Sequence, residues 1–204
     1  MTLNEQAGKP AKTVTIVHED SAFGSGLAQL LNTQLPERGL LWQAVLDRKI
    51  DWIVSDHACC SGEQKWSRDD PTNIWLAKSG FGGTEYLLSG VVSEGSKRGM
   101  SYNHMAELLC WKPAQRFGLL DKGDIARGFD ADIVLVDPHD RFVVRAAESE
   151  SKQEYSPFEG QELTGRVKST FLRGALVYHD GKIIGPARGR YMRRPLVSDT
   201  VENK

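Results

Sequence analysis

The hydrophobic pattern of the chain changes near Leu120, and this change limits the folds that the sequence can adopt. Turn residues precede a short apolar strand in "GDIARGFDADIVLVDP" (123–138), and further strands are predicted in "RFVVRA", "RVKSTFLRG" and "ALVYHDGKIIG". The last stretch contains Asp180-Gly181, a pair that favours a tight β-hairpin. We therefore predict a small antiparallel β module over residues 121–195.

Three stretches of this C-terminal part are expected to lie outside the strands. Residues 147–164 are rich in Glu, Ser and Gln, which favours a mobile connection. The basic run "RGRYMRR" (188–194) is too narrow to indicate a nucleic-acid surface and predicts a solvated or packed arm. Residues 196–204 are predicted to form a frayed tail.

The part of the chain before Leu120 combines helical spacing with one strand-like run. "LLWQAVLDRK" (40–49) predicts a helix, and "IDWIVSD" (50–56) predicts a mostly apolar strand. An apolar strand beside a helix is typical of a βα repeat, in which a parallel strand is covered on both faces. The sequence therefore predicts an α/β protein, with residues 40–120 as one unit.

Further helices are predicted between this strand and the β module. The stretch at 80–99 opens with glycines and then becomes apolar, with Thr84 as the expected N-cap and Gly99 as the expected stop. Another helix is predicted to begin at Ser101, and a second short helical piece at Pro113.

Residues 1–39 are predicted to form a separate β-loop-α segment. It contains a strand at 12–20, a glycine-bearing turn, and a helix at 27–39 that ends with a proline and a glycine. "KTVTIVHEDSAFGSGLAQLLNTQLPERG" resembles a piece of the periplasmic-type amino-acid or amide binding proteins. That resemblance implies a junction of two gene fragments, although a binding module built on residues 12–39 would lack its second lobe.

Charge and composition exclude several kinds of partner. The 204 residues carry a formal net charge of −1, so no global field draws the chain to nucleic acid. No stretch approaches the roughly 20 apolar residues that cross a bilayer, and the N-terminus lacks the apolar core of a signal peptide. A cytoplasmic protein with a small-molecule or protein partner is therefore expected.

Asp56 and His57 stand at the end of the predicted strand, and this position is the main indication of chemistry. In α/β barrels, groups at the carboxyl end of a strand lie where the active site is built. A carboxylate there can act as a base in metal-assisted hydrolysis, or it can cap the turn after the strand. Cys59 and Cys60 follow, but no second cysteine pair or His-x-His completes a zinc site, so loop packing is favoured.

Five stretches in order resemble the C-terminal part of the cyclic-amide amidohydrolases, the group that holds dihydroorotase, allantoinase and hydantoinase. They are "LWQAVLDRKIDWIVSDHACCS", "GFGGTE", "KPAQRFGL", "KGDIARGFDADIVLVDP" and "GRVKSTFLRGALVYHDGKII". The resemblance, from about Leu40 to Pro195, implies a C-terminal fragment of a (β/α)8 barrel followed by the small antiparallel β module. It also implies a divalent metal, with zinc preferred, and a small cyclic amide or ureide as substrate.

The resemblance also implies roles for individual residues. Asp56 would be a catalytic residue that binds one metal of a pair and shuttles the proton of the attacking hydroxide. His57, Gly80, Gly82 and Gly83 would line the substrate cleft.

The resemblance is incomplete in its metal ligands. The family's N-terminal His-x-His, its carbamate lysine and two further histidines have no counterpart, because the five histidines of this chain are scattered singly. We therefore expect a truncated relative that binds no metal, is inactive alone, and forms homo-oligomers through exposed strand edges. The alternative is a non-catalytic interaction protein of the same superfamily.

Overall fold

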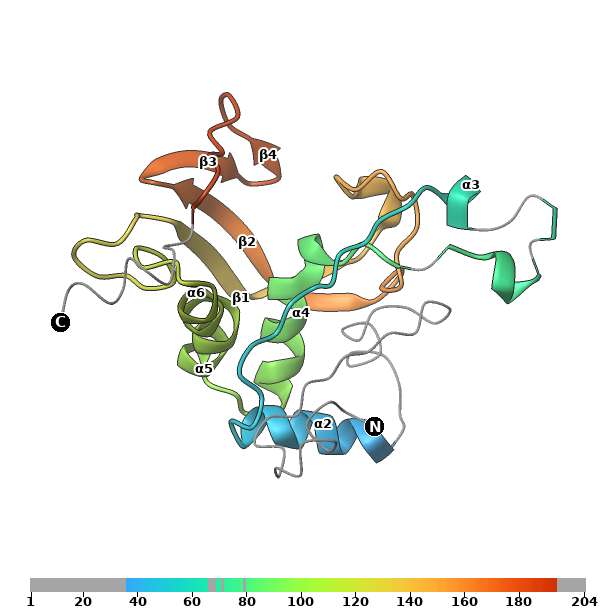
Figure 1. Cartoon of the computed structure of the whole chain (residues 1–204), viewed down its shortest axis with the longest axis horizontal. Helices are drawn as coiled ribbons and strands as arrows, with labels where there is room; N and C mark the ends of the chain where they lie inside the picture. Colours follow the sequence, from blue (N-terminus) through green and yellow to red (C-terminus); the bar gives the residue numbers. More distant parts are fainter. Residues whose placement is uncertain (1–35, 66–68, 71, 79, 194–204) are drawn as a thin grey trace.

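The computed structural model describes residues 36–193, apart from 66–68, 71 and 79, and most of its helices precede its strands (Figure 1). The helical elements are α2 (Pro36–Leu46), α3 (Gly62–Lys65), η1 (Ile74–Leu76), α4 (Thr84–Lys97), α5 (Tyr102–Ala106), the π-helical η2 (Glu107–Trp111), α6 (Lys112–Phe117) and η3 (Ala146–Glu148). The strands are β1 (Ile133–Val143), β2 (Glu162–Leu172), β3 (Ala175–His179) and β4 (Lys182–Ile183).

Helix α2 corrects the boundary that the sequence predicted between two helices. Pro36 and Gly39 were expected to end a helix, but Pro36 is the first residue of α2 and Gly39 lies inside it. Proline is tolerated there because the N–H that it lacks has no partner in the first helical turn. The other elements predicted before residue 36 lie outside the described residues.

The strand predicted at 50–56 is not a strand in the described structure. Residues 49–61 form an extended segment that runs beside α4 toward α3 (Figure 1). Its Ile53 N–H donates to the Leu108 carbonyl at 3.2 Å, which ties the segment to η2 rather than to a sheet. A β-ladder requires a neighbouring strand, and the described residues place none beside this segment.

The helices after this segment follow the prediction more closely. Gly83, rather than Thr84, is the N-cap of α4. Glycine has no side chain, so the N-cap residue forms no side-chain hydrogen bond to the helix. A helix was predicted to begin at Ser101, and Ser101 is the N-cap of α5, where its hydroxyl accepts the His104 N–H at 3.2 Å. Pro113 falls in the first turn of α6, and the unpredicted π-helical turn η2 precedes it. A proline disrupts the regular helical hydrogen bonds before it, so a changed helical period is expected there.

The strands form one antiparallel sheet in the order β1-β2-β3-β4, as the sequence predicted for the β module. β1 joins two stretches that were predicted as separate strands, because register shifts after Leu135 and Asp137 bend it while it stays paired with β2. Asp180 and Gly181 have φ values of 41° and 81°, as a tight hairpin turn between β3 and β4 requires.

Helix α4 lies between two hydrophobic clusters and joins the helices to the sheet. The first cluster contains Trp42, Val45, Val91, Val92, Met100, Met105 and Leu108. The second contains Tyr86, Val144, Phe158 and Leu163. α4 also contacts β2 directly, since the Ser89 hydroxyl donates to the Gly165 carbonyl at 2.8 Å.

The connection at 147–164 is not the mobile segment that its composition predicted. Phe158 is fully buried and its ring lies edge-on to Tyr86, with 6.0 Å between ring centroids. Gln153 and Leu163 are also buried, and β2 already begins at Glu162. A few buried side chains in a polar stretch, Phe158 foremost, therefore hold the connection in the core.

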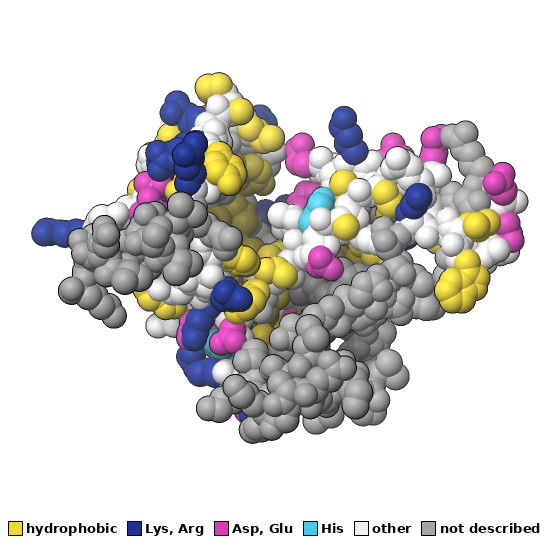
Figure 2. Space-filling view, in the orientation of Figure 1, with side chains coloured by type: hydrophobic (Ala, Val, Ile, Leu, Met, Phe, Trp, Pro, Cys, Tyr) yellow, Lys and Arg dark blue, Asp and Glu magenta, His cyan; other side chains and the backbone are white. Residues whose placement is uncertain are grey.

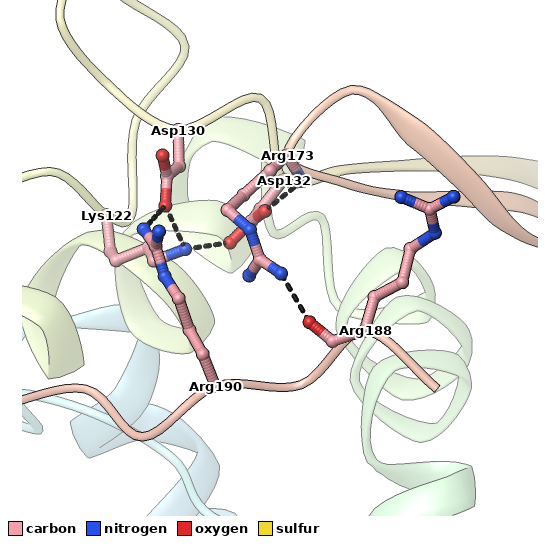
Figure 3. Close-up of polar contacts among 6 residues, drawn as sticks. All are labelled: Lys122, Asp130, Asp132, Arg173, Arg188 and Arg190. Carbon is pink, nitrogen blue, oxygen red and sulfur yellow. Dashed lines mark hydrogen bonds and ion pairs between the residues drawn. The ribbon is translucent and has the colours of Figure 1, made fainter. Parts of the chain in front are cut away.

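Polar contacts hold the C-terminal arm against the β module (Figure 3). Lys122 pairs with Asp130 at 2.7 Å and also with Asp132. Arg190 reaches Asp130 at 3.2 Å. The Arg173 guanidinium donates to the carbonyl oxygen of Arg188. These contacts fix an arm that the basic run was expected to form.

Candidate active site

The turn at Asp56 lies where the extended segment 49–61 passes the N-terminal end of α4. Asp56 has a left-handed backbone with φ of 48°, which Asp tolerates better than most residues. Its side chain is exposed, and no hydrogen-bond partner for its carboxylate appears within the described ranges. The Ser55 hydroxyl lies 3.0 Å from that of Thr84, so the residue before Asp56 is tied to the first residue of α4.

His57 is bonded to the same helix end. Its Nδ1 accepts the Gly83 N–H at 3.1 Å and the Thr84 N–H at 3.3 Å. The first N–H groups of a helix have no partner inside the helix, so these bonds satisfy groups that would otherwise face solvent. The structure therefore joins two parts of the predicted site, His57 and Gly83.

The other predicted glycines are needed because backbone and side chains approach them closely. A Cβ at Gly80 would lie 2.5 Å from the Ala58 carbonyl oxygen, and Gly80 also has φ of +92°. A Cβ at Gly82 would lie 2.5 Å from Oε1 of the buried Gln153. That same oxygen accepts the Gly82 N–H, and the Ala58 N–H donates to the Phe81 carbonyl at 2.9 Å.

The glycine segment 80–83 is supported by a layer of side chains that the sequence analysis did not predict. Lys65 is buried, donates from Nζ to the Gly80 carbonyl at 3.0 Å, and lies 3.9 Å above the centroid of the Phe81 ring. Burial lowers the pKa of this ammonium group. Phe81 also meets Tyr155 edge-on, with 5.9 Å between centroids.

Cys60 belongs to this supporting layer. Its sulfur lies 3.3 Å from the Tyr155 hydroxyl. Burial raises the pKa of Tyr155, and the contact with Cys60 adds to this effect. These contacts support the packing role that was preferred over zinc binding for Cys60, whereas Cys59 is exposed. The long sequence separation explains why no local pattern predicted Lys65, Gln153 or Tyr155.

The donor groups in the described residues do not fit a metal site. Over this part of the chain no group of three or more His, Cys, Asp or Glu side chains could hold a metal ion. Near Asp56, the Nδ1 of His57 is already bonded to α4. His179 Nδ1 lies 2.9 Å from the Ser169 hydroxyl in the sheet, and burial lowers the pKa of His104 in α5. A zinc site needs three or four protein ligands, which these residues do not bring together.

An α/β chain with this glycine segment beside a Ser-Asp-His turn has clear relatives. Residues 38–177 match the model of the Amidohydrolase family, and the chain belongs to that family. It is 36% identical over 154 residues to an allantoinase of Rubrobacter xylanophilus, covering 75% of this chain and 33% of the relative. An allantoinase of Deinococcus radiodurans is 37% identical over the same length, with the same coverage.

Solved structures give the same result. A dihydropyrimidinase from Brevibacillus agri superposes with a TM-score of 0.66 at 32% identity, over 72% of this chain and 32% of that one. L-Hydantoinase from Arthrobacter aurescens superposes with a TM-score of 0.72 at 28% identity, over 79% of this chain and 40% of that one. The chain thus spans about a third of the length of the curated relatives, and the amidohydrolase resemblance is confirmed.

The remaining expectations concern the N-terminal segment and membrane-spanning helices. The family match begins at residue 38, and no support was found for the resemblance of residues 12–39 to periplasmic-type binding proteins. Within the described ranges, every helix is too short or too polar to cross a membrane.

Proposed function

We propose that this chain supplies part of the active site of a cyclic-amide hydrolase, with an amide or ureide ring as the substrate class. The observation that carries the proposal is the packing of the Ser55-Asp56-His57 turn against the glycine segment 80–83 at the start of α4. This arrangement occurs in a chain related to allantoinases and to hydantoinases. Residues 40–120 would be the end of a (β/α)8 barrel, in which the extended segment 49–61 would lie beside a strand of the rest of the barrel, followed by the β module.

In this proposal Asp56 is the catalytic carboxylate. Its exposed side chain can accept a proton from an attacking water, which is the task of a general base in amide hydrolysis. Gly80, Gly82 and Gly83 let the backbone of this segment pack closely against Ala58, Gln153 and Ser55, and we propose that the segment lines the substrate cleft beside Asp56. The family is generally metal-dependent, and zinc is the metal we propose, with Asp56 as one ligand. The described residues do not complete such a site, so we expect no hydrolysis by this chain alone.

A chimera tests the proposal directly. Residues 38–177 replace the matching segment of the Rubrobacter xylanophilus allantoinase, which supplies the rest of the fold. We expect allantoin hydrolysis by the chimera and its loss on Asp56→Asn, with the parent enzyme as positive control. A folded, metal-loaded chimera without activity would contradict the proposal, as would activity that Asp56→Asn leaves unchanged.

The second candidate is a non-catalytic interaction protein of the same family. It is favoured by the small donor set around Asp56 and by apolar side chains exposed over β3 and β4 (Figure 2), where Leu176 and Ile183 lie. An inactive but folded chimera would favour this candidate. Self-association and a cytoplasmic location stay predictions.

A further inference from the structure

We propose that His57 is a positioning residue that caps α4 from another segment, with Nδ1 as the acceptor and the ring proton on Nε2. The N-cap of α4, Gly83, has no side chain, so the helix cannot cap itself in the usual way. His57 Nδ1 caps the helix end from outside, by accepting the N–H groups of the N-cap residue Gly83 and of the first helical residue Thr84. Both bonds require a lone pair on Nδ1, so the ring proton must be on Nε2.

The consequence of this cap is the placement of Asp56. The Ser55–Thr84 hydroxyl contact fixes one side of Asp56 to α4, and the His57 cap fixes the other. Asp56 is thereby held in a left-handed conformation that would otherwise be costly. The helix is itself anchored in the core through Val91 and Val92, so the turn is attached to a rigid element.

The cap also defines what His57 offers to a ligand. Its side chain is exposed, and its Nε2 has no partner among the residues that the structure describes. With Nδ1 occupied, His57 can only donate through Nε2–H. The structure therefore assigns it as a donor to a ligand oxygen, such as the carbonyl of a cyclic amide. This last step rests on the proposed function, whereas the cap does not.

Nitrogen-15 NMR of the full chain at mildly alkaline pH tests the tautomer without any activity. We expect the His57 ring to show an unprotonated Nδ1 and a protonated Nε2. A ring that carries its proton on Nδ1 would overturn the proposal.

Three substitutions separate the cap from the donor. His57→Asn keeps an acceptor near the Nδ1 position and loses the Nε2–H donor. His57→Gln keeps a donor near Nε2 and loses the cap, and His57→Ala loses both. Amide exchange of Gly83 and Thr84 should accelerate about fivefold in the Gln and Ala variants and stay unchanged in the Asn variant. Equal exchange in all four proteins would overturn the cap.

The same variants in the chimera test the donor. His57→Asn should raise KM for allantoin about fivefold, the change that a lost hydrogen bond produces. His57→Gln should instead lower kcat, because Asp56 loses its fixed position. An unchanged KM in an active Asn variant would overturn the donor role. An inactive unmutated chimera would refute the proposed function instead, and the cap would still be decided by NMR.

Discussion

The sheet and the candidate site hold their backbones in place by different means. In β1 to β3 each strand is paired with a neighbour in the sequence, and the ladder bonds repeat along its length. In the site half, defined here as residues 49–61 and 80–83, the backbone belongs to no sheet, and scattered contacts such as those of His57 and Gln153 hold it. The sheet can therefore lose one hydrogen bond and keep its backbone in place, whereas the loss of one contact in the site half should move the backbone there.

The largest effect expected from this comparison concerns metal and catalysis. The purified chain should hold well under one equivalent of tightly bound metal and should not hydrolyse allantoin, hydantoins or dihydroorotate above a blank, because a zinc site needs about three or four ligands. Elemental analysis after desalting and a hydrolysis assay measure both. One metal ion per chain, or turnover that Asp56→Ala removes, would show that the site half is complete.

Phe158→Ala should have the next largest effect, because it removes the ring that closes the second hydrophobic cluster under the connection. Deleting a buried phenylalanine side chain costs about 3–5 kcal/mol, and Phe158 is 0% exposed. Phe117→Ala is the matched control, since that ring is 44% exposed. Urea unfolding gives both free energies. Equal losses would mean that the connection is not part of the core.

Local sequence rules predicted the features whose partners are close in the chain. The Asp180-Gly181 hairpin and the helix start at Ser101 are formed by residues within a few positions, and both were predicted. The strand at 50–56 was predicted wrongly, because a mostly apolar run shows that a segment suits a buried strand but not that a partner strand is present. Phe158 was missed because its polar neighbours dominate the composition of 147–164.

The candidate site shows the same limit. The resemblance to amidohydrolases pointed to Asp56, His57 and the glycines, but no pattern pointed to the residues that hold them. Gln153 bonds to Gly82 across 71 positions, a separation that spacing rules do not cover. The helix cap by His57 was likewise invisible, since caps are normally sought within the helix's own sequence.

Gly82→Ala tests whether a single contact, here between Gln153 and Gly82, is needed to hold the backbone of the site half. The added Cβ would meet the buried Gln153 side chain at 2.5 Å, and overpacking of this kind costs about 1–3 kcal/mol. Gly189→Ala is the matched control, because nothing lies within 4 Å of its Cβ position. Thermal unfolding of the two variants gives the difference. A neutral Gly82→Ala would mean that Gln153 moves freely and does not fix the glycine segment.

The smallest effect should come from the polar contacts of the β module, where redundancy protects the fold. Hydrogen bonds from Lys122 lower the pKa of Asp130. Burial alone would raise the pKa of Asp132, but hydrogen bonds from Lys122 and from the Arg173 N–H lower it. Carboxylates with a lowered folded pKa stabilise the protein above their ordinary value of 3.8 and stop doing so as pH falls through the folded value.

Lys122→Met should therefore reduce stability near neutral pH and flatten its decline below about pH 4. The change should be smaller than for Gly82→Ala, because Arg190 still pairs with Asp130 and the Arg173 N–H still bonds to Asp132 when Lys122 is replaced. Lys182→Met is the control, since that lysine lies in β4 and forms no ion pair in the described structure. Urea midpoints measured from neutral to acid pH test this. Parallel pH curves for the wild type and Lys122→Met would show that Lys122 does not set the acid response.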